Sequence, residues 1–275
     1  MKKTLYIIAL AIVTLTAITS CKIETTKDYV EQQTKIVNVQ PFNAIVNNTY
    51  ADVHFTPSDK YEVKITGSEK LVKRISVKVS NGNLIISGQG KDEVNYIYSG
   101  KHAGIAEVWV KAPTLNAISE TGSGDIYIEG TITTSKLSVT AEGSGDITTD
   151  GINCSDSLQI TTLGSGDISL NKPVKAKAAG IYASGAGDFS IGNLTSQKVE
   201  IQSLGSGDVS ARISQAAEIT VNNSGSGDID LNVDKCGIIS GGIIGSGDVS
   251  VRGTAKSCDI SSSGPGDVIQ EINKQ

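Results

Sequence analysis

The stretch Ala141-Glu142-Gly143-Ser144-Gly145-Asp146-Ile147-Thr148 decides the fold, because its central tetrapeptide returns throughout the second half of the chain. Gly-Ser-Gly-Asp occurs six times, and the variants Gly-Ala-Gly-Asp and Gly-Pro-Gly-Asp complete a set of eight. Successive aspartates are 19 to 21 residues apart. A fixed period of this length indicates a chain built from stacked repeats. The repeat aspartates are Asp125, Asp146, Asp167, Asp188, Asp208, Asp228, Asp248 and Asp267.

The residues around each tetrapeptide alternate between apolar and polar. In the second copy, Val139, Ala141 and Ile147 share one parity with both glycines, whereas Thr140 and Thr148 hold the other. Alternate side chains of a β-strand lie on opposite faces, so the pattern predicts one long or bent, half-buried strand with its glycines facing inward. Inward glycines mark a corner or a close approach of facing walls. A variable stretch of about six residues follows each unit, and we expect it to form an outer loop or a second short strand.

Stacking these units predicts an all-β fold, a right-handed parallel β-helix (solenoid) with coils of about 20 residues, each rising about 4.8 Å. Helical repeats are disfavoured because no 3.6-residue period occurs and glycine is frequent within the unit. A leucine-rich repeat would need a Leu-x-Leu pattern, and a propeller blade would need about twice the length. With aromatics at only 4% and a single methionine, the core must be filled by Ile, Val and Ala between closely spaced walls.

The region 41–112 contains a degenerate copy of the unit. Residues 42–45 (FNAI) match 115–118 (LNAI), and 52–55 (DVHF) match 125–128 (DIYI), both at an offset of 73. Eight of the 11 aromatics that follow residue 20 precede residue 111, so we expect bulkier residues to close this end of the core. Between the matched segments, alternation predicts strands at 61–65, 75–79, 84–86 and 108–110.

The start of the chain has the features of an export signal. Lys2 and Lys3 precede the 16 uncharged residues 4–19, and the segment closes with Ile18-Thr19-Ser20-Cys21. This ending is similar to a bacterial lipobox and implies cleavage before Cys21 and acylation of that residue; an ordinary secretory signal with a chance cysteine is the alternative. We therefore predict a lipoprotein signal peptide at 1–20, a tether at 21–40, irregular N-terminal coils and cap at 41–112, and the regular repeat β-helix at 113–275.

Charge and cysteine usage exclude several classes of protein. The net charge is −5, or −7 once Lys2 and Lys3 are removed, and no basic run occurs, which disfavours a nucleic-acid partner. Cys154, Cys236 and Cys258 form neither a disulfide framework nor a CxxC metal pair. Cys236 and Cys258 could pair on neighbouring coils, although buried or idle thiols are the favoured interpretation.

The lipobox, the less regular N-terminal segment and the tandem Gly-Ser-Gly-Asp-Ile units together resemble the head GIN domain family of auto-transporter adhesins, common in Bacteroidota. The resemblance covers about residues 40–270. It implies a β-helical protein attached to the cell envelope at the outer membrane, with its periplasmic or surface orientation left open. The adhesin label of that family comes from its architecture and brings no ligand residues with it.

The repeat aspartates are the first candidates for chemistry. Stacked carboxylates about 4.8 Å apart repel each other by roughly 1 kcal/mol, so something must offset the repulsion. The favoured explanation is structural, with each carboxylate accepting nearby backbone N–H groups in an Asx-type turn. The alternative is a cation ladder that binds Ca²⁺, which prefers carboxylate oxygens. We expect no metal site and no cofactor.

Catalysis and binding are the remaining candidates. His54 and His102 are far apart, Arg212 and Arg252 could share a solvated face, and the serines recur without a histidine partner, so no catalytic residue is expected. Sugar-binding surfaces expose aromatics, yet Tyr127 and Tyr182 look isolated. The best candidate contact surface is therefore a polar loop at 89–104 with Tyr96 and Tyr98. The expected partners are the membrane, through the lipid anchor, and a glycan or surface protein.

Overall fold

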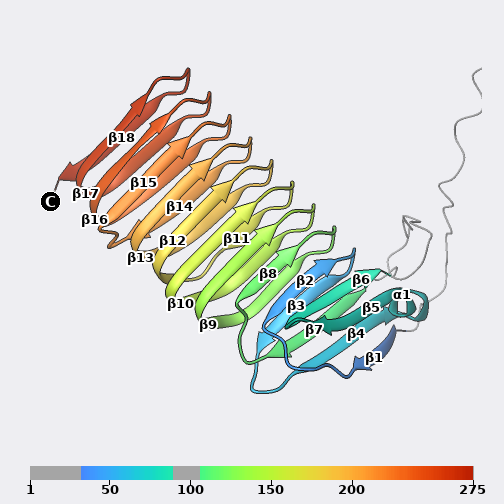
Figure 1. The fold of residues 1–275 in the computed structure, drawn as a ribbon. Coiled ribbons are helices and arrows are strands. Elements are labelled where there is room, and N and C mark those ends of the chain that lie inside the picture. The colour runs from blue at the N-terminus through green and yellow to red at the C-terminus, as the bar shows by residue number, and fades with distance from the viewer. Residues whose placement is uncertain (1–31, 89–105, 275) are drawn as a thin grey trace, which may run out of the picture. The chain divides into compact units, whose positions relative to one another are not determined.

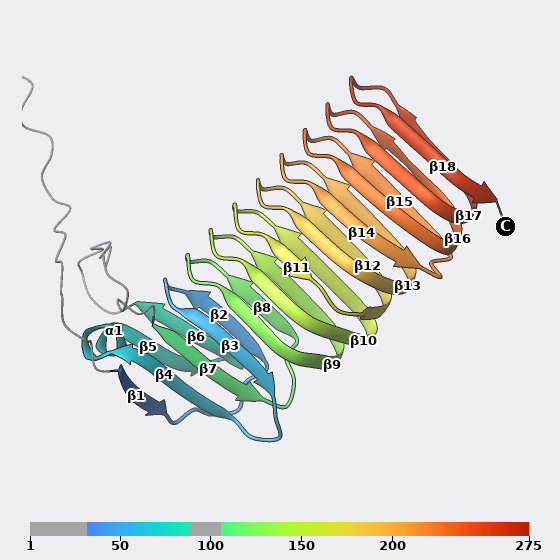
Figure 2. The same cartoon turned by 180° about the vertical axis from the view of Figure 1, so that it is seen from behind.

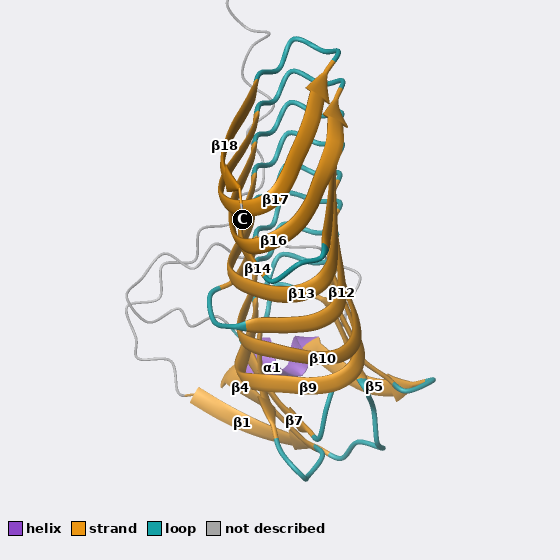
Figure 3. Cartoon of the chain, turned by 90° about the vertical axis from the view of Figure 1, so that its left-hand side faces the viewer, coloured by secondary structure: helices purple, strands orange, loops and turns teal. Residues whose placement is uncertain are grey.

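Most regular coils consist of one long bent strand and one corner. The parallel neighbours β9 (Ile126–Ala141) and β10 (Ile147–Thr162) pair along two walls, with Ile147 opposite Ile126 in the first wall and Ile160 opposite Val139 in the second. Figure 3 shows the strands curving around one edge of the coils and the loops lying at the opposite edge. Apolar side chains fill the space between the walls because one parity of each strand faces inward.

The computed structural model describes residues 32–88 and 106–274, so the predicted signal peptide, Cys21, His102 and the Tyr96/Tyr98 loop lie outside the described residues. The strands wind into a β-solenoid of about eight turns with coils of about 20 residues, which confirms the predicted β-helix (Figures 1 and 2). The remaining strands of the regular part are β8 (Ala117–Glu120), β11 (Ile168–Leu170), β12 (Val174–Ala183), β13 (Phe189–Ser203), β14 (Val209–Ser214), β15 (Glu218–Asn223), β16 (Ile229–Ile243), β17 (Val249–Ser262) and β18 (Val268–Lys274).

The tetrapeptide forms the corner of each coil. Strand β9 ends at Ala141 and β10 begins at Ile147, so the chain turns at the glycines, which confirms the bent form of the unit and the corner interpretation. The variable stretch lies at the bend of the long strand in most coils, rather than in an outer loop. Differences in its length are absorbed by register shifts, such as the one between Cys154 and Ser157 of β10. In two coils the bend separates two strands, β11 from β12 and β14 from β15, as the short-strand alternative expects.

Glycine is required at the corner because successive coils touch there. A Cβ on Gly145 would lie 2.3 Å from the carbonyl oxygen of Gly124, and a Cβ on Gly166 would lie 2.0 Å from that of Gly145. The backbone N–H of Ser165 also donates to the carbonyl oxygen of Gly143 at 3.0 Å. The close approach is therefore between neighbouring coils along the stack, and not between the facing walls.

The degenerate first coil forms where the offset of 73 predicts it. Strands β2 (Ala44–Asn48) and β3 (Asp52–Pro57) pair in parallel with β8 and β9. Ile45 lies opposite Ile118 and Val53 opposite Ile126, so both matches are confirmed residue by residue.

Antiparallel strands and one short helix cover the N-terminal end of the core. The helix α1 (Glu69–Arg74) buries Leu71 and Val72, and the Ser68 side chain caps it by accepting the N–H of Leu71. Strand β1 falls within the range 21–40 that is expected to be a tether. The strands here are β1 (Gln32–Val37), β4 (Glu62–Ser68) and β7 (Glu107–Ala112) in one wall and β5 (Ile75–Ser80) and β6 (Asn83–Gly88) in the other.

The three cysteines after residue 21 are free thiols. Cys236 lies opposite Ala255, whereas Cys258 lies opposite Ile239, so the pairing considered for these two is not formed. Cys154 is buried, and burial raises the pKa of its thiol to about 11. A thiol with a raised pKa is a poor nucleophile at neutral pH, which fits the interpretation as idle core residues.

Candidate functional site: an aromatic and carboxylate cluster

The repeat aspartates form a hydrogen-bonded ladder that starts one coil earlier than the tetrapeptide does. Oδ1 of each aspartate accepts the backbone N–H of the aspartate in the next coil, for example Asp188 N to Asp167 Oδ1 at 2.8 Å. The first rung is Asp125 N to Asp52 Oδ1 at 3.0 Å, and the last is Asp267 N to Asp248 Oδ1 at 2.8 Å. The intermediate rungs measure 2.7 to 2.9 Å.

This ladder supports the structural explanation of the aspartates in a modified form. The acceptor oxygen is directed to the neighbouring coil and not to a local Asx turn, so each carboxylate joins two coils. A charge-assisted bond of this kind offsets the repulsion between stacked carboxylates. Within residues 32–88 and 106–274, no group of three or more His, Cys, Asp or Glu side chains is placed to hold a metal ion.

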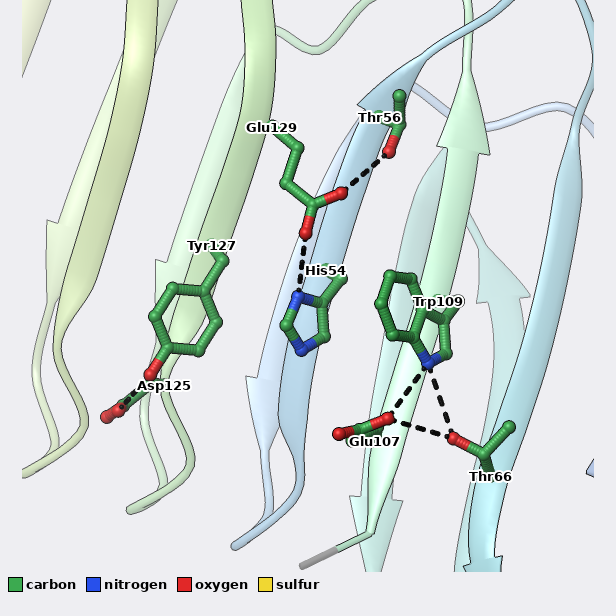
Figure 4. Close-up of polar contacts among 8 residues, drawn as sticks. All are labelled: His54, Thr56, Thr66, Glu107, Trp109, Asp125, Tyr127 and Glu129. Atoms are coloured by element: carbon green, nitrogen blue, oxygen red, sulfur yellow. Dashed lines mark hydrogen bonds and ion pairs between the residues drawn. The ribbon is translucent and has the colours of Figure 1, made fainter. Parts of the chain in front are cut away.

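A stack of three aromatic rings stands on the outer face near the N-terminal end (Figure 4). His54 of β3 lies in register with Trp109 of β7 on one side and with Tyr127 of β9 on the other. The ring centroids of His54 and Trp109 are 4.2 Å apart with planes at 13°, and those of His54 and Tyr127 are 5.0 Å apart at 18°. Parallel strands place equivalent side chains directly beside each other, and this spacing suits stacked rings.

Carboxylates hold the polar atoms of all three rings, as the dashed lines in Figure 4 show. His54 Nδ1 lies 3.0 Å from Glu129 Oε1. The hydroxyl of Tyr127 donates to Asp125 Oδ2 at 2.8 Å, and this hydrogen bond is the main cause that raises the pKa of Tyr127 to about 12. Trp109 Nε1–H donates to Glu107 Oε2 at 3.1 Å and to Thr66 Oγ1 at 3.3 Å. The hydroxyl of Thr56 donates to Glu129 Oε2 at 3.3 Å.

The outer side of the cluster combines aromatic rings with carboxylates. The rings cover each other's faces, and Lys64 Nζ lies 5.1 Å from the centroid of Trp109 at the end of the stack. The surface toward solvent therefore consists of ring edges alternating with carboxylates. Carboxylate oxygens accept hydrogen bonds from hydroxyl or amide groups, and ring edges pack against apolar C–H surface, so the chemistry matches a saccharide or a polar protein surface.

Sequence reasoning missed this cluster, although one signal was available. Tyr127 was expected to be an isolated outward tyrosine, and the structure contradicts this because His54 stacks on it. The offset of 73 already aligns these two residues. The position of Trp109 needed the register of β7 against β3, which no repeat in the sequence specifies.

Some of the other expectations about side chains are confirmed, and others concern residues outside those that the structure describes. Phe189 directly follows the repeat aspartate Asp188, on the inward parity, and it is core. Arg212 and Arg252 do share a face, on either side of Asn232. Cys21, Tyr96 and Tyr98 cannot be placed beside the cluster, since they lie outside the described residues.

The coils and the capped N-terminal end define the class of the protein as a β-solenoid, with an aromatic and carboxylate cluster on its outer face. The chain belongs to the family described as "Putative auto-transporter adhesin, head GIN domain", whose model matches residues 41–226. No curated protein matches the sequence. Among the described residues, no helix is long and apolar enough to cross a membrane.

Solved structures of similar fold come from Bacteroidales. A structure described as a putative adhesin from Bacteroides fragilis is 25% identical, with a TM-score of 0.66, and the match covers 88% of this chain and 97% of that one. A putative adhesin from Parabacteroides distasonis is 17% identical with a TM-score of 0.71, covering 88% and 100%. A protein described as a putative lipid binding protein from the same species is 19% identical with a TM-score of 0.62, covering 87% and 97%. These last two likenesses show the fold alone.

Proposed function

We propose that the chain is a lipid-anchored cell-envelope protein of the outer membrane that acts as an adhesin, or binding scaffold, without catalysis. The observation that carries the proposal is the adhesin-family match over 41–226 on a solenoid whose repeated carboxylates hold the coils together. A repeating rung with a structural task offers no distinct pair of acidic groups for glycoside chemistry. The expected partners are the membrane and a glycan or surface protein, and the acidic net charge argues against nucleic acid.

The anchor is supported by the sequence Ile18-Thr19-Ser20-Cys21 and is tested through Cys21. The unmodified chain, expressed in its host, is expected to incorporate labelled palmitate and to partition into the detergent phase. Cys21→Ser is expected to abolish both the palmitate label and the detergent partition, because serine lacks the thiol that is acylated. Cys258→Ser is the matched control. Detergent partition of the Cys21→Ser protein equal to that of the unmodified chain would contradict the anchor.

The contact role is tested with the chain from Lys22 onward, which contains every described strand. This protein is screened against arrays of glycans and matrix proteins. Tyr127→Ala is expected to weaken binding at the aromatic cluster, while Tyr182→Ala, an outward tyrosine outside the cluster, is not. A ligand whose binding depends on Tyr96 and Tyr98 would instead assign contact to the loop at 89–104.

Two other outcomes would replace the proposal. A screen without any ligand, together with altered envelope integrity after deletion of the gene, would favour a structural envelope component. Turnover of any polysaccharide by the purified chain would make the protein an enzyme.

A further inference from the structure

An open hollow of about 480 Å³ lies on the outer face of the first wall, far along the stack from the aromatic cluster. It spans neighbouring strands β13, β14, β16 and β17, and both small and long residues line it. The volume is within the range of small-ligand sites. The residues that matter for its chemistry are Ser190, Ser210, Arg212, Asp230, Asn232 and Arg252.

The two arginines of the hollow differ in their charge partners. Arg252 is engaged, with Nη1 3.6 Å from Asp230 Oδ1 and Nε 3.2 Å from Glu271 Oε2. Arg212 has no ion-pair partner among residues 32–88 and 106–274, although the chain carries a net negative charge. The hollow therefore presents one uncommitted guanidinium in register with the amide of Asn232.

The donors and acceptors of the hollow select one kind of ligand. A free guanidinium binds a carboxylate through two parallel hydrogen bonds. Asp230 lies beside it and would repel a compact dianion such as phosphate, but its carboxylate accepts hydrogen bonds from hydroxyl groups. Ser190, Ser210 and Asn232 add both donors and acceptors. This mixture matches a molecule with one carboxylate and several hydroxyls.

We propose that the hollow binds a carboxylate-bearing saccharide, a uronic-acid unit of a glycan, with Arg212 receiving the carboxylate and Asp230, Asn232 and the serines receiving the hydroxyls. The assignment rests on the proposed function in that it names the ligand class of an adhesin. It adds a second contact surface, separate from the aromatic rings.

The test measures binding of a galacturonate trimer and of the neutral galactose trimer to the chain from Lys22 onward, by calorimetry at low salt. The unmodified chain is expected to bind the galacturonate trimer at least tenfold more tightly than the neutral one. Arg212→Gln is expected to remove at least tenfold of the uronate affinity, and Arg212→Lys to restore only part of it. Lys177→Gln removes one positive charge from an exposed position on β12 and is expected to leave the uronate affinity unchanged.

A second variant blocks the hollow without changing any charge. Ser210 is an exposed strand residue that lines the hollow, so Ser210→Phe places an aromatic ring in it. This variant is expected to abolish uronate binding while its melting temperature stays near that of the unmodified chain. Equal affinity for the two trimers, or uronate binding unchanged by both Arg212→Gln and Ser210→Phe, overturns the assignment. The glycan and protein arrays separate this result from the proposed function: binding of another ligand there leaves the adhesin role standing, whereas empty arrays remove both.

Discussion

At the corner of each coil, glycine and aspartate meet two different physical demands. The corner glycines leave space for the backbone of the neighbouring coil, and none of them has a positive φ. Close approach between coils is therefore the reason that glycine recurs at these positions in each repeat. Each aspartate carboxylate accepts a hydrogen bond from the backbone of the next coil at the same contact, as Asp167 does from Asp188. The tetrapeptide therefore encodes the contact between coils.

Substituting a corner glycine tests the first demand. Gly166→Ala would place a Cβ 2.0 Å from a backbone oxygen and is expected to lower the free energy of unfolding by about 3 kcal/mol or more. Gly242→Ala is the control, because the nearest atom to its Cβ is 3.7 Å away. Urea denaturation measures both, and equal losses for the two variants would contradict close approach as the cause.

Substituting a repeat aspartate tests the second demand. Asp167→Ala leaves the N–H of Asp188 without its carboxylate acceptor and is expected to cost about 1–2 kcal/mol, while Asp167→Asn keeps an acceptor oxygen and is expected to cost less. Because the ladder is satisfied by backbone donors, a chelator is expected to leave the melting temperature unchanged. A fall of several degrees with chelator, reversed by Ca²⁺, would instead support the cation ladder.

Glu120 is a buried carboxylate beneath the first regular corner. Its Oε1 accepts the N–H of Gly122 at 2.6 Å, and its side chain is fully shielded from solvent. Burial raises the pKa of Glu120 to about 6, and the N–H groups of Gly122, Gly143 and Gly145 offset part of the rise. The next coil has Ala141 at the same position, so the carboxylate is a special feature of the junction with the N-terminal cap.

The raised pKa of Glu120 predicts a pH dependence of stability. The unfolded chain releases this proton near 4.5 and the folded chain near 6, so the stabilising contribution is complete below pH 4.5 and lost as the pH rises through 6. The expected loss is about 2 kcal/mol. Glu120→Gln is expected to remove this slope, and the exposed Glu142→Gln is expected to keep it. Urea titrations at pH 4, 5, 6 and 7 give the comparison, and an unchanged slope in Glu120→Gln would assign the pH effect to another group.

At the scale of elements, parallel pairing converts a position in one strand into a column across many strands. The same register that aligns the core columns also stacks His54 between Trp109 and Tyr127. This stack joins the irregular N-terminal strands to the first regular coil. It therefore has a structural task as well as the proposed role in contact.

Removing the central ring tests the structural task of the stack. His54→Ala is expected to lower the free energy of unfolding by about 1–3 kcal/mol, since each stacked pair contributes about 0.5–1.5 kcal/mol. Trp109 is the only tryptophan of the chain, so its emission is expected to shift to longer wavelength when the ring that covers it is lost. Tyr182→Ala serves as the control; an unshifted spectrum in His54→Ala would show that the rings do not stack in solution.

At the scale of the molecule, each coil contacts only its neighbours. Stability is then approximately a sum of coil terms and interface terms. In the regular part the paired positions are offset by one coil throughout, as Ile147 with Ile168 and Val209 with Ile229. The N-terminal end differs because antiparallel strands and α1 cover the core there.

Deleting one whole coil tests this modular organisation. Removal of residues 189–208 joins Asp188 to Val209 and keeps the ladder and both walls in register, so the shortened chain is expected to fold cooperatively with a melting temperature a few degrees lower. Removal of residues 189–198 alone breaks the register and is expected to prevent a cooperative transition. Thermal unfolding followed by circular dichroism distinguishes them, and similar unfolding of both would contradict independent coils.

The sequence predicted the repeat, the stacking and the first degenerate coil, because the spacing of Asp125 from Asp146 and the offset of Asp52 from Asp125 are visible in one dimension. It left open whether the strand is straight or bent at the glycines, since an alternating pattern continues through Gly143 and Gly145 whether the backbone is straight or turned. It also missed β1, whose polar residues pair only at an edge.

The sequence by itself determined that this protein is a solenoid of 20-residue coils, because a period and a parity are properties of the chain alone. Only the tertiary structure decided where each carboxylate and ring is directed. The oxygen of Asp167 could accept a local or a distant N–H, and Tyr127 could stand alone or stack, with the same sequence pattern. Contacts between coils decide these questions, because the partners of Asp167 and Tyr127 are 20 or more residues away in the sequence. The register between the strands determines which residues meet.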